Sequence, residues 1–147
     1  MTKNTALFWV DVALFGLLAV TVLTVAPEVF SHSMLHVAAG SLLSLGALLH
    51  IVLHWSWIKN AVQRFDRLPD QARANFWLNL ALFCAYIMCG GMGLIARALL
   101  ILFPLHILLG IVHVLLAALV ITLQVIHIAR HWKWMTATAR RLILVRQ

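Results

Sequence analysis

Four long apolar stretches make up most of this 147-residue chain, and each is long enough to cross a bilayer as a helix. They lie at about residues 5–26, 27–58, 75–96 and 104–129. Because the bilayer interior has no water to satisfy backbone polar groups, chain segments cross it as helices or as closed barrels. Hydrophobic residues make up 64% of the chain and charged residues only 10%, which excludes an ordinary soluble domain. We predict an all-α integral membrane four-helix bundle that forms a single domain over residues 1–147.

The chain also contains an internal repeat. Residues 8–15, FWVDVALF, match residues 76–83, FWLNLALF, at an offset of 68. The second and fourth stretches match at an offset of 77, which also aligns Pro27 with Pro104 at positions that suit a first helical turn. Because the first stretch has a repeat partner, we interpret it as a retained helix rather than a cleaved signal peptide. We therefore predict a tandem repeat of two transmembrane helices, over residues 5–60 and 73–137.

The basic residues predict the orientation of the helices. Ten of the 11 lysines and arginines fall on one side of the membrane in the predicted topology, and only Arg97 falls on the other. Because basic loops stay on the cytoplasmic side, both termini are expected in the cytoplasm, with the bacterial inner membrane as the expected location. All six tryptophans fall near the same interface, where an indole is favoured. The net charge of +7 is dispersed at helix ends and does not indicate nucleic-acid binding.

A histidine pattern, His-x13-His-x3-His-Trp-x-Trp, occurs once in each repeat. Fourteen residues of helix leave the first two histidines about 40° apart on one face and about 21 Å apart along the axis. Because polar groups are costly in hydrocarbon without a partner, these faces are predicted to point into the bundle. The two copies are His36, His50, His54, Trp55 and Trp57, and His113, His127, His131, Trp132 and Trp134.

The second and fourth helices are expected to run parallel, so equivalent histidines lie at the same depth. His36 then faces His113, and His50 faces His127. Two imidazoles at one depth can bind a haem iron from its two sides, so two such pairs can hold two b-type haems. On the same face, Gly40 can leave space for a porphyrin or simply let the helices pack closely.

This arrangement resembles the two-haem cytochrome b superfamily, in which paired helices each carry two histidines thirteen residues apart. More narrowly, residues 36–57 are similar to the small membrane family known as domain of unknown function 4405, and the similarity covers nearly the whole chain in two copies. The resemblance implies His36 and His113 as axial ligands of an outer haem, and His50 and His127 as axial ligands of an inner one.

Other polar residues have several open interpretations. His54 and His131 share the ligand faces but lie nearer the interface, which suits a contact to a haem propionate, a quinone pocket, alternative ligation of the inner haem, or simple packing. Gln124 and the repeat-related pair Asp11 and Asn79 can accept a hydrogen bond from a ligand histidine, and an acid in that place makes the imidazole a stronger donor.

The outer ends of the helices carry a further group of candidates. His32 and His106 are not related by the repeat and are expected to contact an outer propionate or to be solvated at the interface. Gly90, Gly91 and Gly93 are expected to mark the outer end of the third helix and its loop.

A haem iron with two histidine ligands has no open position for oxygen or substrate, which favours electron transfer. We therefore expect a dihaem b-type cytochrome that carries electrons across the membrane, as a subunit of a respiratory or redox complex and in a homo- or hetero-oligomer. Quinone or a partner redox subunit is expected to exchange electrons with it. The chain has no glycine-rich nucleotide motif, cysteine cluster or CxxCH motif, so no catalytic site of its own is expected.

Two other functions are compatible with the sequence. Histidines four residues apart, His50 with His54 and His127 with His131, can bind zinc or copper in a membrane protein for metal transport or storage. Alternatively, the chain is a membrane anchor without a redox role.

Overall fold

The structure is a computed structural model that describes residues 3–25, 34–99 and 105–144. Four α-helices and one short 3-10 helix account for nearly all of these residues. They are α1 (Lys3–Leu23), α2 (Met34–Gln63), η2 (Phe65–Arg67), α3 (Asp70–Ala98) and α4 (Leu105–Leu144). All four α-helices are long and apolar enough to cross a membrane. The prediction of an all-α protein with four membrane-spanning helices is confirmed.

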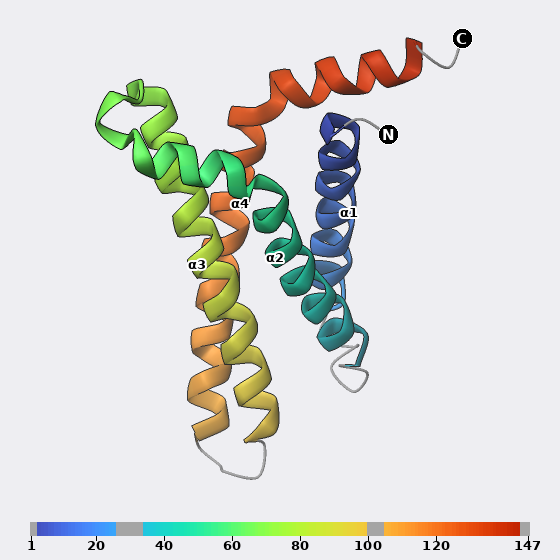
Figure 1. Ribbon diagram of the computed structural model, residues 1–147. Coiled ribbons are helices and arrows are strands. Elements are labelled where there is room, and N and C mark those ends of the chain that lie inside the picture. The colour runs from blue at the N-terminus through green and yellow to red at the C-terminus, as the bar shows by residue number, and fades with distance from the viewer. Residues whose placement is uncertain (1–2, 26–33, 100–104, 145–147) are drawn as a thin grey trace.

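Three of the helices continue beyond the apolar stretches that predicted them. The 40 residues of α4 correspond to a length of about 60 Å, twice the thickness of the hydrocarbon core, which is about 30 Å. Residues 130–144 contain no glycine or proline that would end the helix. Figure 1 shows that this last part of α4, drawn in red, turns away from the axis of the bundle.

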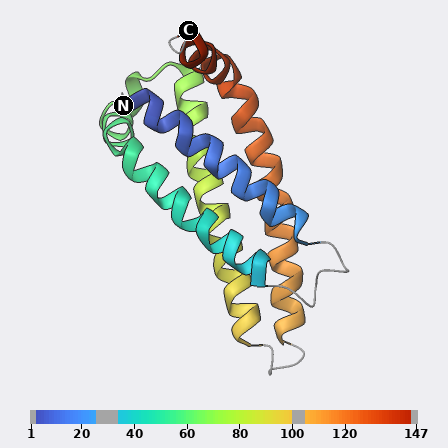
Figure 2. The same cartoon turned by 90° about the vertical axis from the view of Figure 1, so that its right-hand side faces the viewer.

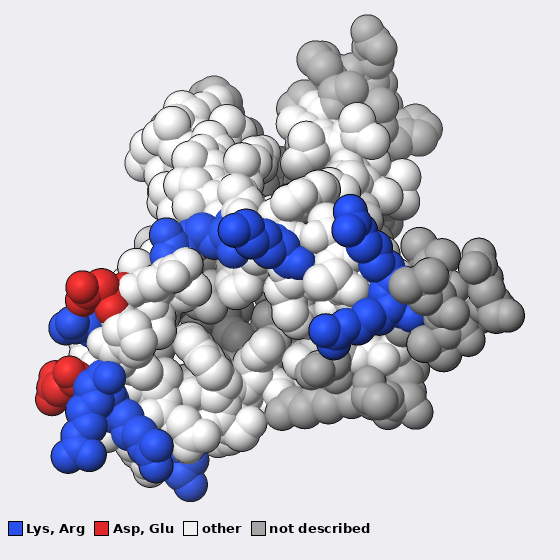
Figure 3. Space-filling model, turned by 90° about the horizontal axis from the view of Figure 1, so that it is seen from above, with Lys and Arg blue, Asp and Glu red and all other residues white. Residues whose placement is uncertain are grey.

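The helices form two hairpins. α1 packs along α2, and α3 packs along α4. The two hairpins contact each other mainly through α2 and α3 (Figures 1 and 2). α2 and α4 run in the same direction, and the start of α1 and the end of α4 lie at the same end of the bundle (Figure 1). We call this end the terminal end. Figure 3, which looks onto it, shows lysine and arginine side chains across the middle of this face and at one of its corners.

Among the residues that the structure describes, the small buried core contains only apolar side chains. Leu43 on α2 and Val120 on α4 are among its members and are no more than 5% exposed. Large apolar side chains such as Leu23 and Met34 are about three quarters exposed on the outside. Apolar outer surfaces suit a lipid environment, because lipid chains rather than water then cover them.

Candidate functional site

His36 on α2 and His113 on α4 face each other across the two hairpins. The centroids of their rings are 6.0 Å apart, and the ring planes are nearly perpendicular, at 88°. A metal-bound imidazole nitrogen lies about 2.0 Å from its metal, and the ring centre lies about 1 Å behind that nitrogen, so two rings on opposite sides of one metal have centres about 6 Å apart. The separation of the two rings therefore fits one metal ion bound between them.

Backbone carbonyls hold both of these rings by their Nδ1 atoms. Nδ1 of His36 lies 3.0 Å from the carbonyl oxygen of Thr21 on α1. Nδ1 of His113 lies 2.8 Å from the carbonyl oxygen of Cys89 on α3. Because a carbonyl oxygen only accepts hydrogen bonds, each Nδ1 carries the proton and donates it. In a neutral imidazole of this tautomer, Nε2 keeps its lone pair, which is the form that binds a metal.

The Nδ1 atoms of the second pair of histidines lie against side-chain oxygen atoms rather than backbone carbonyls. Nδ1 of His127 lies 2.9 Å from Oδ1 of Asn79 on α3. Nδ1 of His50 lies 3.0 Å from Oδ1 of Asp11 on α1. The contact between His50 and Asp11 has the distance of an ion pair, although Nδ1 is not aligned with an acceptor as in a hydrogen bond.

The partners of the four histidines follow the offset of the sequence match. Thr21 and Cys89 are 68 residues apart, and so are Asp11 and Asn79. The first helix of each hairpin therefore supports both histidines of the second helix, at equivalent positions in the two hairpins.

His54 and His131 extend the second pair into a cluster of four imidazoles. The ring of His54 lies 4.6 Å from that of His50, and the ring of His131 lies 4.6 Å from that of His127, measured between centroids. The side chains of His50, His54, His131 and Asp11 are all close enough for their charges to act on His127. Nε2 of His131 is buried and has no hydrogen-bond partner within the described ranges.

Two glycines of α3 make room for neighbouring side chains. A Cβ atom at Gly93 would lie only 2.9 Å from Cε1 and Nδ1 of His113, and one at Gly90 would lie 2.8 Å from Oγ of Ser44. The prediction that Gly90, Gly91 and Gly93 mark the end of the third helix is wrong, because α3 continues past all three. The spacing of Gly90 and Gly93 is the sequence signal for this packing role, since small residues three apart share a helix face and permit close packing.

The structure also locates Gln124 and Gly40. The hydroxyl of Tyr86 on α3 donates a hydrogen bond to Oε1 of Gln124 on α4, at 3.3 Å. Gln124 is therefore paired with Tyr86, whereas His127 has Asn79 as its partner. A Cβ atom at Gly40 would lie 3.8 Å from Cγ2 of Thr21, so this glycine faces α1.

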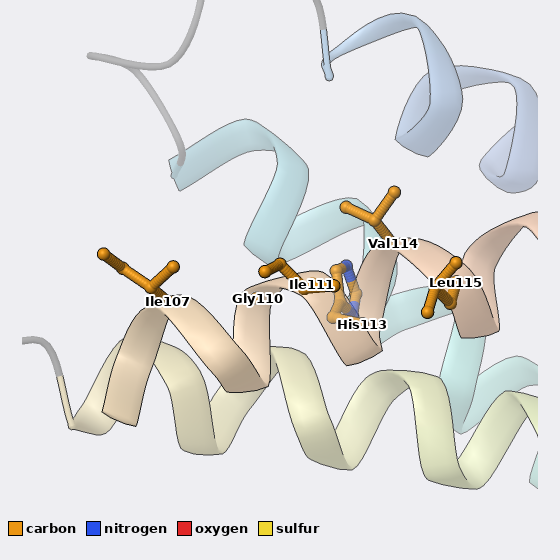
Figure 4. A pocket seen from close by; sticks show the side chains of 6 residues that line it. All are labelled: Ile107, Gly110, Ile111, His113, Val114 and Leu115. Carbon is orange, nitrogen blue, oxygen red and sulfur yellow. The ribbon is translucent and has the colours of Figure 1, made fainter. Parts of the chain in front are cut away.

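An apolar hollow of about 450 Å³ lies along α4 beside the first pair of histidines. Figure 4 shows the six side chains that line it, and the only polar one is an imidazole. They are Ile107, Gly110, Ile111, His113, Val114 and Leu115. All six residues belong to α4, and Ile111, Val114 and Leu115 are more than half exposed, so this hollow is an open surface of the helix rather than an enclosed site.

The remaining candidates lie at the ends of the helices. His106 is in the first turn of α4, and His32 lies outside the described residues. Among the residues that the structure describes, no group of three or more histidine, cysteine, aspartate or glutamate side chains is arranged to hold a metal ion. In comparisons with known proteins, no family model, curated protein or solved structure matches this chain.

Proposed function

We propose that this chain is a dihaem b-type cytochrome that carries electrons across the membrane. His36 and His113 are the axial ligands of one haem, and His50 and His127 are those of the other. One observation carries the proposal: the Nδ1 atoms of all four histidines lie against oxygen atoms on α1 or α3. Nε2 is then the atom of each ring that is available to iron.

Support of Nδ1 by an oxygen atom is typical of histidines that bind metals. Such a contact fixes the tautomer and the orientation of the ring, and it raises the basicity of the ligand. The four contacts involve two hairpins and follow one sequence offset, which argues against an accidental arrangement. A haem with two histidine ligands needs one imidazole from each of two facing helices, and the 6.0 Å separation of the His36 and His113 rings suits this requirement.

A haem with two histidine ligands supplies a one-electron couple without an open coordination position. The chain itself holds and orients the ligands and separates the two sites. Leu43 lies seven residues from both His36 and His50, and Val120 lies seven residues from both His113 and His127. Both apolar residues are buried, so hydrocarbon rather than water fills the level between the two histidine pairs. A dry environment of this kind is one of the factors that set a haem potential.

The contacts of Nδ1 also favour one ligand set for the site nearer the terminal end. His50 and His127 have supporting partners at equivalent positions of α1 and α3, as the first pair has. We therefore assign His50 and His127 as the inner ligands, and His54 and His131 to a contact with a propionate or a quinone head group.

The terminal end is proposed to face the cytoplasm of a bacterial cell. Lysines and arginines gather on this end (Figure 3), and basic segments are retained on the cytoplasmic side of membranes. Electrons are then exchanged with quinone or with a partner redox subunit, since the chain carries no motif for a nucleotide or an iron–sulfur cluster.

A pyridine haemochrome assay on the protein purified from cells with ample haem tests the proposal. We expect a b-type spectrum and about two haems per chain, as two bis-histidine sites require. A protein without haem under these conditions would overturn the proposal. Zinc or copper in its place would support the metal-binding alternative, for which the described residues offer no site with three ligands.

Single histidine variants then test the ligand assignment. His36→Ala and His113→Ala are expected to remove the same haem, and His50→Ala and His127→Ala to remove the other. His106→Ala is the control for axial ligation, because this residue lies in the first turn of α4, seven residues before His113, and is not one of the four proposed ligands. Loss of both haems in the control, or of a different haem in each member of a pair, would contradict the assignment.

A further inference from the structure

The two hairpins differ at one of the equivalent positions that support the histidines. The first helix of the first hairpin has Asp11 beside His50, whereas the first helix of the second hairpin has Asn79 beside His127. The two distances are nearly equal, at 3.0 and 2.9 Å, but only the contact between His127 and Asn79 is aligned as a hydrogen bond, and only Asp11 carries a charge. The first pair of histidines has no such difference, because both of its partners are neutral backbone carbonyls.

Asp11 is also unusual because of its position in the chain. The sequence has only four acidic residues, and among those that the structure describes, Asp11 is the one inside an apolar stretch of spanning length. Of the other described acidic residues, Asp66 lies in the turn after α2, and Asp70 begins α3 with an exposed carboxylate that pairs with Arg73. An acidic residue inside a membrane span is costly unless it has a partner. The carboxylate of Asp11 has one in His50, and its side chain is only 23% exposed.

The charge of Asp11 reaches more than one histidine of the cluster. It acts on His127 and on His131, both of which belong to α4. Asp11 is the only acidic group among the described residues that acts on either of them. It is therefore the main source of negative charge at this site, and it comes entirely from the first hairpin.

We propose that Asp11 is a positioning residue that makes His50 the stronger of the two inner ligands and lowers the midpoint potential of the inner haem. This inference rests on the proposed function. A carboxylate attracts the proton on Nδ1 more strongly than an amide oxygen does, so the imidazole gains basicity. A more basic ligand and a nearby negative charge both stabilise the oxidised iron, which carries the higher positive charge. Asn79 gives His127 the same orientation without this effect.

Redox titration of the purified holoprotein, followed by absorbance, tests the inference with reciprocal variants. In Asp11→Asn, the potential of one haem is expected to rise while that of the other stays unchanged. In Asn79→Asp, the potential of the same haem is expected to fall. The double variant, which exchanges the two side chains, is expected to return towards the wild-type potential, because both histidines bind one iron. Asp66→Asn removes an equal charge from the exposed turn and is the control.

The outcomes separate this inference from the proposed function. Two bound haems with unchanged potentials in both single variants would overturn the role of Asp11 and leave the proposed function standing. A wild-type protein without haem would overturn both. If Asp11→Asn does not assemble, Asn79→Asp still decides the question, because it keeps Asp11 and adds a carboxylate at the equivalent position. Equal shifts of both haems, or a shift in the Asp66→Asn control, would mean a general effect of charge and would also overturn the inference.

Discussion

Replacing Gly93 by alanine tests how closely α3 must approach the ring of His113. The added methyl carbon would lie 2.9 Å from Cε1 and Nδ1 of the ring, well inside the distance of about 3.5 Å at which carbon atoms attract each other. The ring cannot withdraw freely, because its Nδ1 donates to the carbonyl of Cys89 at 2.8 Å. Overpacking of this kind costs about 1–3 kcal/mol.

Gly91→Ala is the matched control, because a Cβ atom at Gly91 meets nothing within 4 Å. Both variants gain the same helix propensity, about 1 kcal/mol for alanine over glycine, so this term cancels between them. The free energy of unfolding of Gly93→Ala is therefore expected to be about 1–3 kcal/mol below that of Gly91→Ala.

Unfolding in one detergent, followed by circular dichroism, measures this difference. Absorbance of the same samples is expected to show that Gly93→Ala weakens only the haem proposed to bind to His36 and His113, while Gly91→Ala keeps both of the proposed haems. Equal stability of the two variants, together with unchanged spectra, would refute the close approach of α3 to the ring of His113.

Two further predictions concern the pairing of α3 with α4 and the orientation of the chain. Gln124→Leu leaves the Tyr86 hydroxyl without its acceptor and is expected to lower the free energy of unfolding by about 1–3 kcal/mol. Tyr86→Phe removes the hydroxyl itself and is expected to cost less, so a larger loss in Tyr86→Phe would contradict the pairing. A reporter that fluoresces only in the cytoplasm is expected to be bright when fused to the C-terminus of the chain. A dark fusion, paired with an active periplasmic reporter at the same position, would reverse the proposed orientation.

Much of the fold could be predicted because it depends on local composition and periodicity. Apolar stretches of spanning length predicted the four helices, and the histidine faces predicted an inward direction that the buried Leu43 and Val120 share. The ends of the helices could not be predicted in this way. α4 continues far beyond Ala129, because a helix needs no apolar residues to continue, only the absence of a residue that stops it.

The candidate site was predictable in its residue types and less so in its contacts. The repeat offset already paired Asp11 with Asn79 as possible partners of ligand histidines, and the structure places each beside one. Gln124 was also predicted as a possible hydrogen-bond partner of a ligand histidine, because it lies only three residues before His127 in the sequence. The structure pairs it with Tyr86 instead, because the side chain that reaches His127 comes from the neighbouring helix.

The sequence by itself determined that the chain has four helices long and apolar enough to cross a membrane, and which faces of α2 and α4 carry the histidines. Both properties follow from the order of residues within a single helix. Only the tertiary structure decided what holds each ring and how closely the rings approach. The carbonyls of Thr21 and Cys89 carry no sequence signal, because every residue has a carbonyl. The need for glycine at position 93 likewise arises only when α3 and α4 pack side by side, since the atoms that exclude a Cβ belong to His113 on the other helix.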